Sequence, residues 1–220
     1  MKPETSDKER IISNARDFVT GLFRDEYSGH DASHTFRTAA LASRLAREEG
    51  ADEFAVTLAA LLHDVDDVKL SPETAEDLSR ASEFMSGNGL DESLISTVCA
   101  IIRSVGFKGS DSVVPNSIEG KCVQDADRLD AIGAVGIARA FAYGGSRARP
   151  MHDPETPPRL NMNEAEYRSS RSTSVNHFYE KLFLLKDMMN TASAKRIAEA
   201  RDGFMRDFID EFLAEWAGER

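Results

Sequence analysis

Apolar residues recur at three- and four-residue steps along most of the chain, and this spacing is typical of helices. The clearest example is a stripe near the C-terminus, interrupted only by Arg201: Ile197, Phe204, Met205, Phe208, Ile209, Phe212, Leu213 and Trp216. A shorter stripe precedes it and consists of Phe178, Leu182, Leu185 and Met189. Stripes of this kind usually pack in a core, so we assign both, Trp216 included, a structural role. The whole pattern predicts an all-α fold.

The N-terminal half shows the same periodicity in five segments. Helices are predicted over residues 4–26, 31–50, 52–66, 71–87 and 90–105. Asp31 suits the N-cap of the second helix and Gly50 suits its end, while Pro72 suits the first position of the fourth. The third helix is apolar on most sides over residues 55–62, which predicts that it is central and buried.

Two segments lack a helical pattern. Residues 108–120 are rich in glycine, serine and aspartate, which is typical of a loop. Residues 144–163 contain Gly144-Gly145 and four prolines, which exclude a continuous helix. We expect a flexible loop over about residues 144–163 and further helices over about residues 164–218.

Composition and charge restrict the class of protein. Hydrophobic residues make up 41% and charged residues 30% of the 220 residues, the balance of a water-soluble globular protein. The formal net charge of -11 would repel nucleic acids and anionic lipid surfaces, so we expect neither as a partner. The charged N-terminus does not resemble a secretory signal, and no apolar run approaches the ~20 residues of a membrane span. A cytoplasmic location is therefore expected.

A candidate site begins at the end of the third predicted helix, with the dipeptide His63-Asp64. An ionised carboxylate buried there is costly unless a divalent cation or a salt bridge to an arginine compensates it. The dipeptide alone leaves both explanations open. It identifies no site by itself, because histidine is also followed by aspartate at His30-Asp31 and His152-Asp153.

Another candidate lies in the second predicted helix. If Asp31 is the N-cap, His34 falls in the first helical turn and His30 stays at the rim of the site. A histidine on the inward side of a helix is more often a hydrogen-bonded core residue than a ligand. That alternative stays open for His34.

The segment 123–133 contains three aspartates. Asp127 and Asp130 can share a helical face, which Asp125 cannot easily join, and Arg128 would at its simplest neutralise these neighbours. Taken together, two histidines and two aspartates on separate helices offer mixed nitrogen and oxygen ligands. Such a set suits hydrolysis assisted by Mn²⁺, Fe²⁺, Zn²⁺ or Mg²⁺.

The order of these motifs resembles the HD superfamily of metal-dependent phosphohydrolases, and more closely its YedJ/YpgQ-like branch. The phrases that carry the resemblance are residues 29–38, 59–69, 117–141, 177–182 and 188–191. The longest is far more specific than the dipeptide. The resemblance implies a single domain over residues 1–220, with a compact multi-helix fold and the metal site between central helices. Its metal-site core would span about residues 28–143, and the C-terminal helices would pack back on that core.

The resemblance assigns four metal ligands: His34, His63, Asp64 and Asp127. It also places Asp67 beside the water that the metal activates. One departure from the family pattern is Asp66, at a position where a small residue is expected; its carboxylate would be solvated or would alter the metal preference. No histidine lies between Val65 and Asp127, and a Gly-Tyr-Pro signature is absent. We therefore predict one divalent ion, with Mn or Fe favoured over Mg, Zn, Co or Ni.

The predicted reaction is hydrolysis of a small phosphorylated substrate. The candidate catalytic residues are Asp67, Lys69 and Arg128, of which Asp67 would orient the water or accept its proton. The candidate substrate-binding residues are His30, Arg139, Arg147 and His177. Surface charge explains Arg147 and its neighbour Arg149 about equally well, and a core role would explain His177.

The resemblance implies that the substrate is a nucleotide, and its specific form would be a nucleoside triphosphate cleaved to monophosphate and pyrophosphate. Two alternatives stay open: a 5′-nucleotidase that acts on monophosphates, and a non-catalytic module that binds a nucleotide or a metal. The protein is expected to be a monomer or a homodimer.

Overall fold

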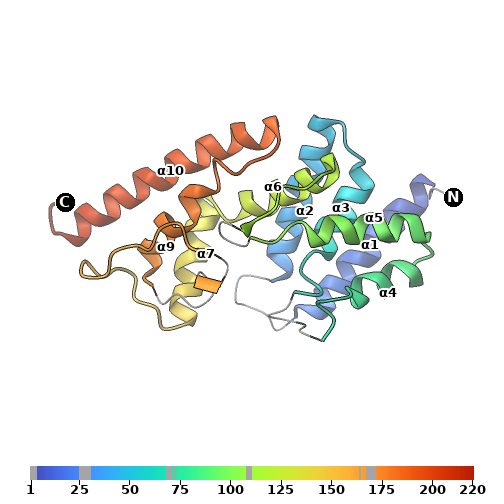
Figure 1. The fold of residues 1–220 in the computed structure, drawn as a ribbon, viewed down its shortest axis with the longest axis horizontal. Helices are drawn as coiled ribbons and strands as arrows, with labels where there is room; N and C mark the ends of the chain where they lie inside the picture. The colour runs from blue at the N-terminus through green and yellow to red at the C-terminus, as the bar shows by residue number, and fades with distance from the viewer. Residues whose placement is uncertain are drawn as a thin grey trace. The chain divides into compact units, whose positions relative to one another are not determined.

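The computed structural model describes residues 4–24, 31–67, 71, 73–107, 111–163, 165–166 and 172–220. Across these ranges the chain forms helices and no strand (Figure 1), which confirms the all-α prediction. Two compact units are distinguished: residues 1–106 with 114–127, and residues 107–113 with 128–220. The single domain stays a prediction. In the described ranges, no helix combines the length and the apolar character that a membrane crossing requires.

The first unit is built around α3 (Glu53–Leu62), which contacts three other helices. These are α1 (Thr5–Leu22), α2 (Ala32–Glu49) and α5 (Glu92–Arg103). Residues 58–62 of α3 are 0% exposed, so the predicted central, buried helix is confirmed. The unit also contains α4 (Ser79–Gly87), which packs on α5, and the greater part of α6 (Ile118–Asp130).

Aspartate side chains begin three of these helices. Asp31 accepts a hydrogen bond from His34 N at 2.7 Å, as predicted, and α2 ends at Gly50, whose φ of 72° is left-handed. Asp52 caps α3 and Asp91 caps α5 in the same way. Each cap satisfies an amide of a first turn that has no partner within the helix. The cap at Asp31 fixes the start of α2 and therefore the position of His34.

Two predicted boundaries near the candidate site are wrong. α3 ends at Leu62 rather than at residue 66, and from His63 onward the backbone continues in turns. α4 begins at Ser79 rather than at residue 71, and residues 73–78 are turns. Pro72, which was expected to open that helix, lies outside the described residues. His63 and the residues after it therefore lie in a turn rather than in a helix.

The second unit contains the end of α6, then α7 (Gly133–Ser146), α9 (Ser174–Glu180), the 3-10 helix η2 (Leu182–Leu184) and α10 (Ala192–Trp216). α7 contacts α9 and α10. Its Phe141 ring lies 5.7 to 6.1 Å from the rings of three aromatic residues: Phe178, Phe208 and Phe212. In the stripe predicted over residues 178–189, Phe178 lies in α9 and Leu182 in η2, whereas Leu185 and Met189 follow η2; all four are buried. A 3-10 turn keeps residues three apart on one side, so the same apolar face stays buried.

Two aromatic residues of α10 are not in the core, contrary to the prediction. Phe204 is 54% exposed and Trp216 is 47% exposed. Phe204 lines an open, mostly apolar pocket of about 310 Å³ beside the start of α7. Trp216 stacks on Phe212 and meets His152 edge-on at 5.5 Å. Periodicity identified the correct helix face but not how far the core extends along it.

Arg201, which interrupts the apolar stripe of α10, has a structural role. Its guanidinium donates a hydrogen bond to Leu129 O at the end of α6. Its aliphatic carbons lie 2.9 to 3.2 Å from the point where a Cβ on Gly133 would be, and Gly133 has a φ of +79°. A cation at a helix C-terminus is stabilising because the last carbonyls carry partial negative charge. Arg201 therefore gives the C-terminal end of α6 a hydrogen-bond donor and a positive charge.

Candidate metal centre

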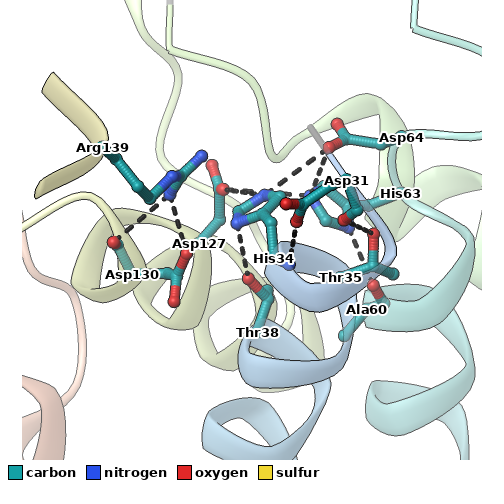
Figure 2. A network of polar contacts seen from close by, with 10 residues as sticks. All are labelled: Asp31, His34, Thr35, Thr38, Ala60, His63, Asp64, Asp127, Asp130 and Arg139. Carbon is teal, nitrogen blue, oxygen red and sulfur yellow. Dashed lines mark hydrogen bonds and ion pairs between the residues drawn. The ribbon is translucent and has the colours of Figure 1, made fainter. Parts of the chain in front are cut away.

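Four polar side chains of the first unit converge at one point, as Figure 2 shows. His34 comes from the first turn of α2, His63 and Asp64 from the turn after α3, and Asp127 from α6. Ligand atoms of His34, His63 and Asp127 all lie within 4.8 Å of one another. The structure therefore brings together the four residues that the family resemblance selected; Asp125 and Asp130, the other aspartates considered, are not in this group.

The distances within this cluster are close to those expected between the ligands of one shared cation. His34 Nε2 lies 3.5 Å from Asp64 Oδ2 and 3.4 Å from Asp127 Oδ1. His63 Nε2 lies 3.4 Å and 3.8 Å from the same two oxygens. Two ligand atoms bound about 2.1 Å from one ion are roughly 3.0–3.4 Å apart in tetrahedral or octahedral geometry. Three of the four separations are within about 0.1 Å of this range.

The hydrogen bonds behind the histidines orient them for this role. His63 Nδ1 lies 2.7 Å from Ala60 O, so Nδ1 carries the proton and donates, which leaves the lone pair on Nε2. That Nε2 atom is buried and has no hydrogen-bond partner among the described residues. His34 Nδ1 has a longer contact, 3.4 Å, with Thr38 Oγ1. A buried nitrogen without a partner that faces two carboxylates is the arrangement a divalent cation would complete.

Asp127 is ionised despite its location. Burial raises the pKa of its carboxyl group, but the hydrogen bond from His34 and the positive charges that His63 and His34 carry when protonated, in the absence of a metal, lower it to about 2. A carboxylate that stays charged at neutral pH is available to a cation without first losing a proton. The site therefore offers two imidazoles and two carboxylates.

The depressed pKa of Asp127 predicts a loss of stability in acid for the metal-free protein. The folded-state pKa, about 2, lies below the unfolded value of 3.8. The ionised carboxylate therefore contributes stability above pH 3.8 that disappears as the pH falls through about 2. The shift corresponds to about 2 kcal/mol. Urea unfolding with a chelator present, over this pH range, should show Asp127→Asn losing less stability than the wild type.

Asp17→Asn, which removes an exposed acid of α1, is the control for this prediction. It should keep the wild-type dependence of the unfolding free energy on pH. An Asp127→Asn protein with that same dependence would show that the carboxylate contributes nothing in the folded state.

Asp67 lies in the same turn as two of the cluster residues and is half-buried. Its N–H donates to Asp64 O at 3.1 Å, and its carbonyl accepts from Ser71 N at 2.7 Å. Asp66, by contrast, is 3% exposed, and both of its carboxylate oxygens accept hydrogen bonds from the start of α4. A solvated Asp66 is therefore excluded. Lys69 and His30 lie outside the described residues.

The other predicted residues belong to the second unit, where the structure gives their local partners. Arg128 is buried and donates to Met188 O. Arg139 Nη1 donates to Asp130 Oδ2 at 2.7 Å and to Asp130 O at 3.2 Å. Arg147 lies over the ring of Tyr143, with 5.6 Å between the guanidinium carbon and the ring centroid.

His177, the remaining predicted residue of the second unit, is an uncharged imidazole. Burial lowers its pKa, and the positive charges of Lys181 and Arg149 lower it further, to about 3. At neutral pH its ring can donate one hydrogen bond and accept one. His177 therefore adds no positive charge to an anionic substrate.

The groups that orient the two histidines were not predicted from the sequence. Thr38 follows His34 by four residues, and helical spacing alone would have placed the two on one face. The carbonyl of Ala60 carries no signal in the sequence, because any residue at that position would provide it. Only the early end of α3 makes this carbonyl available to the His63 ring.

Comparisons with known proteins agree with this geometry. A family model described as the HD domain matches residues 31–132, a range that contains all four cluster residues. The protein YpgQ of Bacillus subtilis (strain 168), described as uncharacterized, is 40% identical over 205 residues, which are 92% of this chain and 92% of YpgQ.

Solved structures show the same similarity. A protein from Lactobacillus plantarum has a TM-score of 0.85 at 38% identity and covers 99% of this chain and 100% of its own. An HD-superfamily hydrolase from Bacillus thuringiensis has a TM-score of 0.76 at 41% identity, with 96% and 98% covered. Bacillus subtilis YpgQ in complex with ADP has a TM-score of 0.74 at 36% identity, with 93% and 96% covered. The chain belongs to the HD-domain superfamily of metal-dependent phosphohydrolases, in the branch that includes YpgQ.

Proposed function

We propose that the protein hydrolyses a phosphate ester of a nucleotide with the help of one divalent metal ion held by four residues: His34, His63, Asp64 and Asp127. The observation that carries this proposal is the His63 ring, which Ala60 O orients so that a buried nitrogen without a hydrogen-bond partner faces two carboxylates. Two neutral imidazoles and two carboxylates carry a charge of about −2, which one divalent ion balances.

Mixed nitrogen and oxygen ligands favour Mn²⁺ or Fe²⁺ over the all-oxygen preference of Mg²⁺. Such an ion, when bound, polarises a phosphoryl oxygen and lowers the pKa of water. The protein supplies the rest. His63 presents a lone pair on Nε2 that the bond to Ala60 O fixes, and the ionised carboxyl of Asp127 needs no deprotonation. Asp67, in the turn that carries Asp64, is placed to orient water or accept its proton.

The nucleotide part of the proposal has separate support. YpgQ, which is 36 to 40% identical to this chain, has been solved in complex with ADP. Among the predicted substrate-binding residues, Arg147 stays a candidate for binding a phosphate, because its guanidinium lies over the face of Tyr143 and its side chain is exposed. Arg128 and Arg139 already donate to Met188 and Asp130 and would have to exchange those bonds.

The test is a screen of nucleoside tri-, di- and monophosphates with Mn²⁺, Mg²⁺, Fe²⁺ and Co²⁺, in which pyrophosphate and phosphate release are measured separately. We expect pyrophosphate from triphosphates. Phosphate released from monophosphates would instead indicate a 5′-nucleotidase, and nucleotide that stays bound but uncleaved would indicate a binding module. Activity that persists after complete chelation would overturn the metal assignment.

Replacing Asp67 by Asn should separate catalysis from metal binding. The amide keeps the size of the side chain but cannot accept a proton, so we expect kcat to fall by about 100-fold or more. Metal content should stay at the wild-type value, because Asp67 is not one of the four ligands. Elemental analysis and steady-state kinetics of the same preparation measure both. A kcat within twofold of the wild type would remove Asp67 from the reaction.

A further inference from the structure

Asp66 caps a helix to which it does not belong. α4 begins after Leu78, which has a left-handed φ of 58° and a side chain that makes no cap hydrogen bond. The amides of the first turn are satisfied elsewhere. Arg80 N donates to Asp66 Oδ1 at 3.2 Å and Ala81 N donates to Asp66 Oδ2 at 3.0 Å, while Ser79 N donates to Asp77 Oδ1 at 3.0 Å. Asp66 thus joins the turn after α3 to the start of α4.

The side chain of Arg80 forms a second link to the same turn, by way of Ser71. Its Nη1 donates to Ser71 Oγ, and Ser71 N donates to Asp67 O at 2.7 Å. The result is a closed ring of four residues, in which each member is bonded to the next or is its neighbour in the chain: Asp66, Arg80, Ser71 and Asp67. The ring encloses the C-terminal side of the turn that follows α3.

This turn carries the residues on which the metal centre depends. Its own backbone bonds are few: Val65 N donates to Leu62 O at 3.3 Å and Asp67 N donates to Asp64 O at 3.1 Å. Asp66 lies between Val65 and Asp67 and is 3% exposed, and its carboxylate links the turn to the start of α4. Buried negative charge is costly, but the amides and the positive end of α4 compensate it.

We propose that Asp66 is a positioning residue of the metal centre. By accepting two hydrogen bonds from α4 it fixes the turn that presents His63, Asp64 and Asp67, and it binds no metal itself because both oxygens are occupied by amides. This inference rests on the proposed function. It explains why a carboxylate takes the place of the small residue expected at this position.

The test compares Asp66→Asn with Asp77→Ala in the full chain. Asparagine at position 66 keeps the size of the side chain, but its NH2 group faces a backbone N–H and one cap bond is lost. Mn²⁺ titrated into the metal-free protein should bind Asp66→Asn about 10- to 100-fold more weakly than the wild type. Asp77→Ala removes the oxygen that accepts from Ser79 N at the same helix start without touching the turn, so its Mn²⁺ affinity should stay within twofold of the wild type.

Hydrogen exchange of the metal-free proteins provides a second measurement. Amides over residues 62–67 should exchange faster in Asp66→Asn only, whereas amides at the start of α4 should exchange faster in both variants. Equal losses of Mn²⁺ affinity in the two variants would show that Asp66 acts only by stabilising α4, and would overturn the proposal. Unchanged affinity in Asp66→Asn would also overturn it.

A milder variant keeps the proposal testable if Asp66→Asn does not fold. Ser71→Ala opens the ring at one hydrogen bond, and we expect a several-fold loss of Mn²⁺ affinity; no loss would count against the ring. Wild-type protein that binds no Mn²⁺ would overturn the proposed function itself. A wild type that binds Mn²⁺ and ring variants that bind it equally well would overturn only the role of Asp66.

Discussion

His63→Ala should remove the metal ion and lower hydrolysis by about 1,000-fold or more, the equivalent of about 4 kcal/mol of transition-state stabilisation. His63 supplies the one nitrogen of the cluster that is both buried and without a hydrogen-bond partner among the described residues. Its absence leaves Asp64 and Asp127 facing a cavity with a single imidazole. Metal content by elemental analysis and phosphate or pyrophosphate release measure the two effects.

His152→Ala is the matched control, because it removes a histidine that is also followed by aspartate and that lies in the second unit, against Phe212 and Trp216. This variant should keep the metal content of the wild type, whatever its effect on stability. Full activity in His63→Ala after chelation and removal of free metal would contradict the assignment of the cluster. Circular dichroism of both variants establishes that the comparison is between folded proteins.

Gly136→Ala should destabilise the protein by about 3 kcal/mol. A Cβ at this position would lie 2.2 Å from Ala131 O, in the backbone between α6 and α7. Backbone atoms cannot rotate away as the end of a flexible side chain can, so the start of α7 must shift relative to the end of α6. Equilibrium unfolding in urea measures the change in the free energy of unfolding.

Gly145→Ala is the control in the same helix. No atom lies within 4 Å of the Cβ position at Gly145, and alanine has a higher helix propensity than glycine. We expect a change between zero and about 1 kcal/mol in the stabilising direction. If the two substitutions changed the unfolding free energy by the same amount, the close approach of α7 to Ala131 would not exist in solution.

Local signals were sufficient for much of the fold. Asp31 and Gly50 were predicted to bound α2, and both do so, because a cap depends on residues close in sequence. The apolar residues of α3 were predicted to be buried, and they are. The end of α3 was predicted too late because the decisive partner of Asp66 is the start of α4, which no local pattern reveals.

Partners that are distant in sequence also determined how much of the candidate site could be predicted. His34, His63, Asp64 and Asp127 were selected by resemblance, and the structure brings them together. Arg128 shows the opposite case: a cation beside a candidate ligand has the same appearance in a sequence whether it meets a phosphate or, as here, donates to Met188 O. Partners that are distant in sequence decide such roles.

The two histidines of the cluster are contacted by different kinds of group, a main-chain carbonyl and a side-chain hydroxyl. Substitution can therefore alter the surroundings of one histidine more easily than those of the other. His63 is oriented by the main-chain carbonyl of Ala60, which survives any side-chain substitution at residue 60. His34 has the hydroxyl of Thr38 as its contact, which one substitution can delete, lengthen or replace with a carboxylate. In evolution or in engineering, a substitution at residue 38 can therefore adjust metal preference. The Ala60 contact, in contrast, is kept as long as the backbone keeps its course.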